Sequence, residues 1–200
     1  QGRVDPRIGH GGRPFAIGFD LRLPTQWNGR FAFHGGGGMD GRLVPAVGDI
    51  HRTLEPSALA RGFAVISSDG GRRGAWTDST FGQDQQARID YAYNALEKIT
   101  LLGKQFVTEF YGRPPDWSYH LGCSNGGRQG LVAAQKLPLL FDGIIAGDPS
   151  MGFSRIAVGE VWNIGVVAKI SPRDLKGRPI LARAFSDADL KRVRDAVLQR

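Results

Sequence analysis

A serine flanked by glycines, placed between a strand-like and a helix-like segment, constrains the fold of this chain more than any other feature. The run Gly122–Gly126 reads Gly-Cys-Ser-Asn-Gly and fits the pattern G-x-S-x-G. It follows a predicted strand over residues 116–121 and opens a predicted helix over residues 126–136. A serine on such a sharp turn has a strained backbone, and side chains two residues before and after it would collide. The two glycines remove both collisions, so the pattern predicts that the Ser124 hydroxyl is exposed above a sheet.

Strand-like and helix-like segments alternate along the rest of the chain. Residues 13–24 alternate apolar and polar side chains, which is the period of a half-buried strand. A helical apolar period over residues 83–111 predicts one long helix or two abutting ones, ended by Gly112. Short apolar runs predict further strands over residues 30–34, 62–68 and 143–147. Strands that alternate with helices predict an α/β fold with a mainly parallel sheet.

The pattern changes after Met151. Residues 153–200 lack strongly periodic strands, and their last predicted helix begins with a capping-box pattern at Ser186. We therefore predict an α/β core over residues 1–152 and a separate region over residues 153–200.

Glycine is in excess, with 29 of 200 residues, or 14.5%, roughly double the usual ~7%. Four of these glycines, Gly35–Gly38, follow a predicted strand, where they let the backbone approach a ligand closely. Acyl transfer needs N–H donors for a developing oxyanion, and we predict them to be the backbone N–H of Asn125 with N–H groups of the glycine run, for which we name Gly37 and Gly38, while the choice among Gly35–Gly38 stays open. A phosphate-binding loop is the alternative. A Walker loop, however, ends in Gly-Lys-Ser/Thr, whereas the acidic Asp40 follows here, and no helix pattern opens directly behind the glycines.

A general base for Ser124 is not found in the order that this architecture uses, which is serine, then an acid, then histidine. His120 lies within the strand before the serine and is predicted to be a packed strand residue. His34 borders the glycine run and is predicted to be a satisfied strand histidine, and Asp148 is predicted to be a turn residue. All four histidines precede the serine, so a triad in the usual order cannot be built from these residues. The histidines are His10, His34, His51 and His120.

Four sequence blocks resemble the tannase and feruloyl esterase family, which also contains the hydrolase of mono(hydroxyethyl) terephthalate. The motif Cys-Ser-x-Gly-Gly-Arg within Tyr119–Gly130 is the most specific of them. The resemblance covers residues 13–200. It implies a secreted or periplasmic serine esterase with an α/β-hydrolase fold, which cleaves small-molecule esters of aromatic acids (feruloyl, galloyl or similar) through an acyl-enzyme. Ser124 takes the nucleophile position, and Asn125 with the glycine run takes the oxyanion positions. The other blocks are Trp27–Phe31, Gly35–Gly38 and Phe141–Gly147.

Some features that the resemblance implies have no match in these residues. Family members join the cysteine beside the serine to a cysteine beside the catalytic histidine, so Cys123 is implied to pair with a partner that is missing here, as are the catalytic Asp and His. Members also carry an inserted lid with a calcium site. Residues 153–200 resemble the segment that leads into this lid, and the calcium loop would follow Arg200. We therefore expect an incomplete α/β-hydrolase, the N-terminal part of a longer enzyme, with little activity by itself and no cofactor bound by its own residues.

Composition argues against several other classes of protein. The net charge is +7, but the arginines are scattered along the whole chain, which speaks against a nucleic-acid partner. The single cysteine excludes an internal disulfide, and no His/Cys cluster indicates a metal site. No apolar run approaches the ~18 residues of a membrane span, and no signal-peptide pattern opens the chain. Two rivals to the esterase remain: a non-catalytic or degenerate α/β-hydrolase-like binding protein, and a nucleotide-binding α/β domain that would hold phosphates at Gly35–Gly38.

Overall fold

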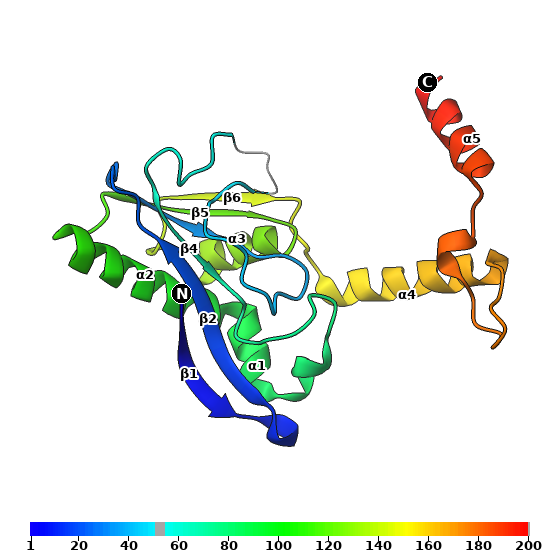
Figure 1. The fold of residues 1–200 in the computed structure, drawn as a ribbon, viewed down its shortest axis with the longest axis horizontal. Coiled ribbons are helices and arrows are strands. Elements are labelled where there is room, and N and C mark those ends of the chain that lie inside the picture. Colours follow the sequence, from blue (N-terminus) through cyan, green and yellow to red (C-terminus); the bar gives the residue numbers. More distant parts are fainter. Residues whose placement is uncertain (51–54, 200) are drawn as a thin grey trace. The chain divides into compact units, whose positions relative to one another are not determined.

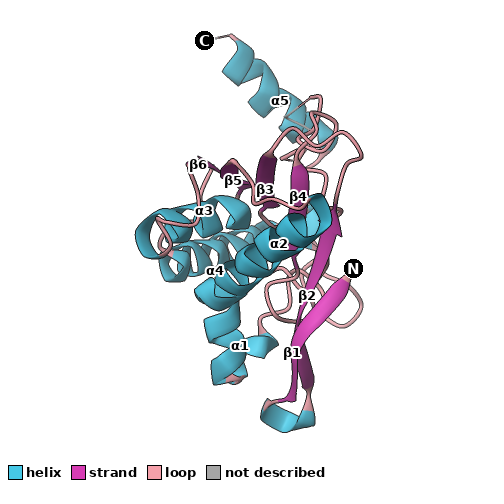
Figure 2. Ribbon diagram, turned by 90° about the vertical axis from the view of Figure 1, so that its left-hand side faces the viewer, coloured by secondary structure: helices cyan, strands magenta, loops and turns pink. Residues whose placement is uncertain are grey.

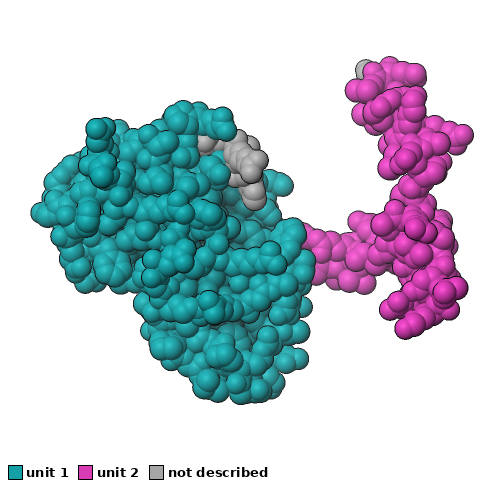
Figure 3. Space-filling view, in the orientation of Figure 1, with its two compact units in different colours: residues 1–150 teal, residues 151–200 magenta. Residues whose placement is uncertain are grey.

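The structure is a computed structural model, which describes residues 1–50 and 55–199. The chain forms two compact units, residues 1–150 and residues 151–200, drawn in separate colours in Figure 3. The first unit contains the sheet and every residue of the predicted site. The second unit follows Ser150 and is helical, and its predicted role as the segment leading into a lid stays a prediction.

The first unit is built on a six-stranded sheet in the order β1-β2-β4-β3-β5-β6 (Figure 1). Strands β4, β3, β5 and β6 run parallel to one another, whereas β1 pairs antiparallel with β2 and β2 pairs antiparallel with β4. This arrangement confirms the predicted α/β class, because helices connect β4 to β5 and β5 to β6, whereas the described residues between β3 and β4 form loops. The strands are β1 (Gly2–Ile8), β2 (Pro14–Arg22), β3 (Arg30–His34), β4 (Ala64–Ser68), β5 (Trp117–Cys123) and β6 (Gly143–Gly147).

Strand β1 is an element that the sequence does not predict. Asp5 and Pro6 interrupt its apolar pattern, and Asp5 has a positive φ of 51°. The pairing with β2 shifts register between Val4 and Arg7, which accommodates this irregularity. Proline is tolerated in β1 because the strand lies at the edge of the sheet, where a missing N–H breaks no central ladder.

Two layers enclose the sheet. Helices α2 (Ala95–Tyr111) and α3 (Asn125–Lys136) cover one face, as Figure 2 shows, while loop residues between β3 and β4 pack on the other. Because side chains alternate along a strand, neighbouring residues of β3 serve opposite layers, and each fully buried large apolar side chain contributes about 1.5–3 kcal/mol. The core under the helices includes Phe31, Phe33, Ile66, Ile99, Val107 and Ala133. The core under the loops includes Ala32, Ala46, Ile50, Ala58, Val65 and Leu121.

The predicted long helix before β5 is built from several helical segments. Helix α1 (Gln85–Ile89) continues through a π-helical turn, η3 (Asp90–Asn94), into α2, which ends at Gly112 in the predicted left-handed conformation, with φ 72°. A 3-10 turn, η2 (Thr80–Gln83), precedes α1. The π turn is not predicted by the apolar period. Such turns occur frequently at functional sites, and this one carries Tyr91.

The second unit consists of helices α4 (Phe153–Ile170) and α5 (Asp187–Leu198), with a short turn η4 (Leu181–Arg183) between them. The capping box predicted at Ser186 is present, since Ser186 accepts from the Asp189 N–H and the Asp189 side chain accepts from the Ser186 N–H. No helix within residues 1–50 and 55–199 is both long enough and apolar enough to cross a membrane.

Candidate active site

Ser124 lies on the turn between β5 and α3. Its φ of 56° and ψ of −119° fall in a region that residues other than glycine avoid. Three backbone hydrogen bonds hold this conformation: the Ser124 N–H donates to the Gly147 carbonyl at the end of β6 (3.0 Å), and the Ser124 carbonyl accepts from the N–H groups of Arg128 (2.9 Å) and Ser150 (3.3 Å). The Ser124 hydroxyl has no hydrogen-bond partner in the part of the chain that the structure describes. The turn is therefore fixed by its backbone, and the hydroxyl is available to a ligand.

Glycines let the loop after β3 pack directly on the first turn of α3. A Cβ atom at Gly122 would lie 2.4 Å from the backbone C and O atoms of Gly126, and one at Gly126 would lie 2.9 Å from the Gly36 carbonyl oxygen. A Cβ atom at Gly35 would likewise lie 2.8 Å from the Gly126 Cα. Real side chains do not approach backbone so closely. The two glycines of G-x-S-x-G are therefore required because another part of the backbone packs directly against each of them.

Three backbone N–H groups beside this turn have no acceptor among the described residues, namely those of Gly37, Gly38 and Asn125. The N–H groups of the two glycines before Gly37 and of the methionine after Gly38 are all satisfied within the protein. Asn125 is the first residue of α3, where helix N–H groups lack partners and the helix dipole favours negative charge. These N–H groups are the ones named from the sequence as oxyanion donors, and that role stays a prediction.

A pocket of about 470 Å³ opens at this edge of the sheet. Its lining includes Ser124, the glycine run and the half-exposed indole of Trp76. The volume lies within the range of about 300–1,000 Å³ typical of small-molecule sites. Its further lining includes the apolar side chains of Val44, Val47 and Ile50 and the charged side chains of Arg42 and Asp49. The pocket therefore offers an apolar cavity with a hydroxyl and N–H donors at one side.

His34 lines the same pocket, but its ring is held by neighbouring loop residues. Its Nδ1 lies 3.2 Å from the Pro45 carbonyl oxygen and 3.3 Å from the Gly48 nitrogen, and its Nε2 lies 3.7 Å from an Asp49 carboxylate oxygen. The ring is buried beneath these groups. This arrangement confirms the prediction of a satisfied strand histidine rather than a base for Ser124.

His120 is a packed strand residue, as predicted. Its ring is fully buried, stacked on Phe33 at 5.6 Å between ring centroids and edge-on to Phe141 at 5.7 Å. Burial lowers the pKa of His120 from 6.5 to about 4, because the apolar surroundings disfavour the charged ring. His120 is therefore neutral at physiological pH and belongs to the core.

We expect the neutral His120 to make stability depend on pH. The unfolded chain takes up a proton near pH 6.5 and the folded chain only near pH 4, so this residue makes the free energy of unfolding fall as the pH drops through that window. Urea unfolding of wild type and His120→Leu at several pH values measures the effect as the difference between the two proteins. A difference that does not change between pH 7 and pH 4 would contradict it.

The remaining sequence candidates lie as follows. Asp148 forms a turn after β6, with φ 38°, and His10 is exposed in a short 3-10 turn between β1 and β2. His51 lies outside the described residues. Cys123 is a free thiol beside the pocket, and its disulfide stays a prediction. No three His, Cys, Asp or Glu side chains gather as metal ligands within the described ranges, and the calcium site implied for a lid stays a prediction.

Sequence reasoning missed a buried polar cluster that links the glycine run to α3. The cluster comprises Asp40, Tyr91, Asn125, Arg128 and Gln129. In the sequence, Asp40 serves only as an argument against a phosphate loop. The available signal was the spacing of Asn125, Arg128 and Gln129, which places three polar side chains on one side of α3.

Comparisons with known proteins agree on one relationship. A family model described as "Tannase and feruloyl esterase" matches residues 7–200. The mono(2-hydroxyethyl) terephthalate hydrolase of Piscinibacter sakaiensis is 40% identical over 206 residues, which cover 99% of this chain and 34% of that protein. A probable feruloyl esterase B-2 of Aspergillus flavus is 42% identical over 137 residues, which cover 68% of this chain and 25% of that protein.

Among solved structures, the crystal structure of feruloyl esterase B from Aspergillus oryzae matches with a TM-score of 0.66 and 30% identity. The match covers 78% of this chain and 29% of that one. Together with the strand order, this likeness confirms the predicted α/β-hydrolase fold. The chain spans about a third or less of the length of these relatives.

Proposed function

Because this chain belongs to the tannase and feruloyl esterase family, we propose that the whole protein is a serine esterase that hydrolyses esters of aromatic acids. The observation that carries the proposal is the position of Ser124. Its hydroxyl is available on a strained turn, at the wall of a pocket that also holds the unpartnered N–H groups of Gly37 and Gly38, next to the start of α3.

The proposed reaction proceeds through an acyl-enzyme. A base takes the Ser124 hydroxyl proton as the oxygen attacks the ester carbonyl carbon. The negative charge that develops on the carbonyl oxygen accepts hydrogen bonds from the N–H groups of Asn125 and of Gly37 or Gly38. The C–O bond breaks, the alcohol leaves with the proton, and water then hydrolyses the acyl-serine by the same route.

The general base that takes the proton from Ser124 is proposed only for the whole protein. His34 and His120 are engaged in the loop packing and in the core, so neither presents a nitrogen to Ser124. The family resemblance implies a histidine that follows Ser124 in the sequence and an acid that orients it. A secreted or periplasmic location rests on the same resemblance.

The proposed substrate class rests on the relatives and on the pocket. One relative is named for feruloyl esters and another for a terephthalate monoester, and both acids are aromatic. The apolar lining of the pocket and the half-exposed Trp76 suit an aromatic ring.

The test uses the protein as its gene encodes it. A serine-directed fluorophosphonate should label the peptide that contains Ser124, and methyl ferulate, methyl gallate or mono(hydroxyethyl) terephthalate should be hydrolysed faster than an aliphatic methyl ester. A non-catalytic binding protein would bind such esters without turnover and would not be labelled. A nucleotide-binding domain would instead bind ATP or NAD saturably and lose this binding when Gly37 is enlarged.

A further inference from the structure

We infer that Asp40 is a positioning residue, whose carboxylate clamps the glycine run to the first turns of α3 and so fixes the N–H groups that face the oxyanion. The inference rests on the proposed function and adds a residue to it. Asp40 follows the glycine run by two residues and is among the residues that line the pocket, but it is only 3% exposed and both of its carboxylate oxygens are bound by side-chain amides of α3.

Each oxygen of the Asp40 carboxylate is held by a different turn of α3. The Asn125 side-chain amide donates to Oδ1 (2.7 Å), and the Gln129 side-chain amide donates to Oδ2 (2.9 Å). The Gln129 Oε1 in turn accepts from the Gly36 N–H (3.1 Å). The Asp40 carboxylate and the Gly36 N–H thereby connect the glycine run to α3. In the sequence these two residues lie on either side of Gly37 and Gly38.

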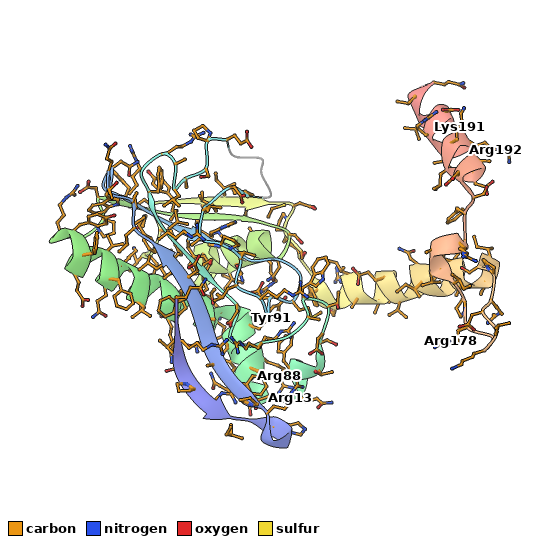
Figure 4. The ribbon with its side chains drawn as sticks, in the orientation of Figure 1. Arg13, Arg88, Tyr91, Arg178, Lys191 and Arg192 are labelled. Carbon is orange, nitrogen blue, oxygen red and sulfur yellow. The ribbon has the colours of Figure 1, made fainter. Side chains whose placement is uncertain are left out.

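Exchanging the positions of the oxygen and the nitrogen of the Asn125 side-chain amide would break its hydrogen bonds. Its Oδ1 accepts from the Arg128 Nε (2.7 Å) and lies 3.0 Å from the Tyr91 hydroxyl, which is also 3.3 Å from the Gly38 carbonyl oxygen. Tyr91, labelled in Figure 4, comes from the π turn. These donors keep the amide NH₂ of Asn125 directed at Asp40, which suits an ionised carboxylate because it has only acceptors.

The space around the carboxylate fits an aspartate closely. A Cβ atom at Gly36 would lie 2.4 Å from Asp40 Oδ1, and one at Gly70 would lie 2.5 Å from Oδ2. Backbone therefore surrounds the carboxylate on both sides that the amides leave open. A longer acid has no room here, and a smaller side chain would leave buried amide donors without acceptors.

Because it is buried, the ionised Asp40 carboxylate destabilises the folded protein. Burial raises the pKa of Asp40 from 3.8 to about 7, in spite of the amide bond from Asn125 and the nearby guanidinium groups. Since the folded-state pKa lies above the ordinary value, the free energy of unfolding falls as the pH rises from 3.8 to about 7, where Asp40 becomes ionised in the folded protein. A group that arranges the site at the expense of stability points to function rather than to packing. The charged and titratable groups that face it are Asp69, Arg72, Tyr91 and Arg128.

The test is Asp40→Asn, which keeps the shape but turns one acceptor into a donor that faces an amide donor. We expect kcat to fall about 10- to 100-fold, as for a weakened oxyanion site, with KM nearly unchanged and with no loss of melting temperature at pH 8. Amide hydrogen exchange of the glycine-run peptide should become faster. Gln129→Met, which removes the amide that donates to Asp40 and accepts from the Gly36 N–H, should give the same pattern and serves if Asp40→Asn does not fold.

The matched control is Asp69→Asn. Asp69 is also a buried acid, but its carboxylate accepts from the Gly18 and Gly71 N–H groups and does not contact the glycine run or α3. Its variant should keep kcat and the exchange rate of the glycine run. Unchanged exchange in Asp40→Asn, or equal changes in both variants, would overturn the inference. Failure of the proposed function is seen separately, as a wild-type protein that is neither labelled nor active, and the exchange comparison decides the role of Asp40 even then.

Discussion

Replacing Ser124 by alanine is expected to lower kcat for aromatic esters by about 10⁴- to 10⁶-fold, with KM nearly unchanged. The serine oxygen is the atom that forms the acyl bond, whereas the pocket and the N–H donors stay in place. Activity that remains should come from the oxyanion donors and from binding, which together give about 10³- to 10⁴-fold over water. The loss should be chemical and not structural, because alanine keeps the Cβ atom and the same strained backbone.

The free energy of unfolding distinguishes loss of the nucleophile from loss of folded protein. Ser124→Ala should unfold within about 0.5 kcal/mol of wild type, whereas Ser124→Gly should be more stable by about 1 kcal/mol, because glycine adopts φ 56° and ψ −119° without strain. Both variants should lose fluorophosphonate labelling. The control is Ser150→Ala, since Ser150 contacts the Ser124 carbonyl only through its backbone N–H (3.3 Å). Ser124→Ala with more than about 1% of wild-type kcat would assign the nucleophile elsewhere.

The strand, turn and helix around Ser124 could be predicted because their causes are local. The apolar period predicts β5 and α3, and Gly122 is required by a contact with Gly126, only four residues away in the sequence. Gly112 and the Ser186 capping box follow for the same reason, since the first ends its own helix in the left-handed conformation and the second satisfies N–H groups at the start of its own helix. Gly126, by contrast, is required by its contact with the distant Gly35 and Gly36.

The parts that could not be predicted depend on contacts between distant residues. Asp40 meets Asn125 and Gln129 across more than 80 residues of sequence, and no period or turn signal encodes such a pairing. The residues of strand β1, which include Asp5 and Pro6, do not favour a strand, and the strand is stabilised by its pairing with β2. The choice of Gly37 and Gly38 among the four glycines of the run likewise needed the structure, because it follows from the N–H groups of Gly35 and Gly36 being already satisfied.

Replacing Gly122 by alanine is expected to damage both the fold and the site, although the change adds one methyl group. Its Cβ would lie 2.4 Å from the Gly126 C and O atoms, and these are helix backbone that cannot rotate aside as a side chain would. We expect the free energy of unfolding to fall by about 3 kcal/mol or more, at the upper end for overpacking. The matched control is Gly82→Ala, since nothing lies within 4 Å of a Cβ there and its φ is not positive.

The activity of any folded Gly122→Ala protein should fall further than its stability explains. To relieve the contact, the first turn of α3 must move away from β5, and that turn carries Ser124 and the Asn125 N–H. A displacement of about 1 Å at reacting groups costs roughly 10²-fold in rate, and here the nucleophile and a donor move together, so a loss of about 10³-fold or more is expected. Urea unfolding and steady-state kinetics on the same preparations measure both effects. If Gly122→Ala is as stable and as active as Gly82→Ala, then the glycine is not required for the turn, and the contact between β5 and α3 does not hold Ser124 in place.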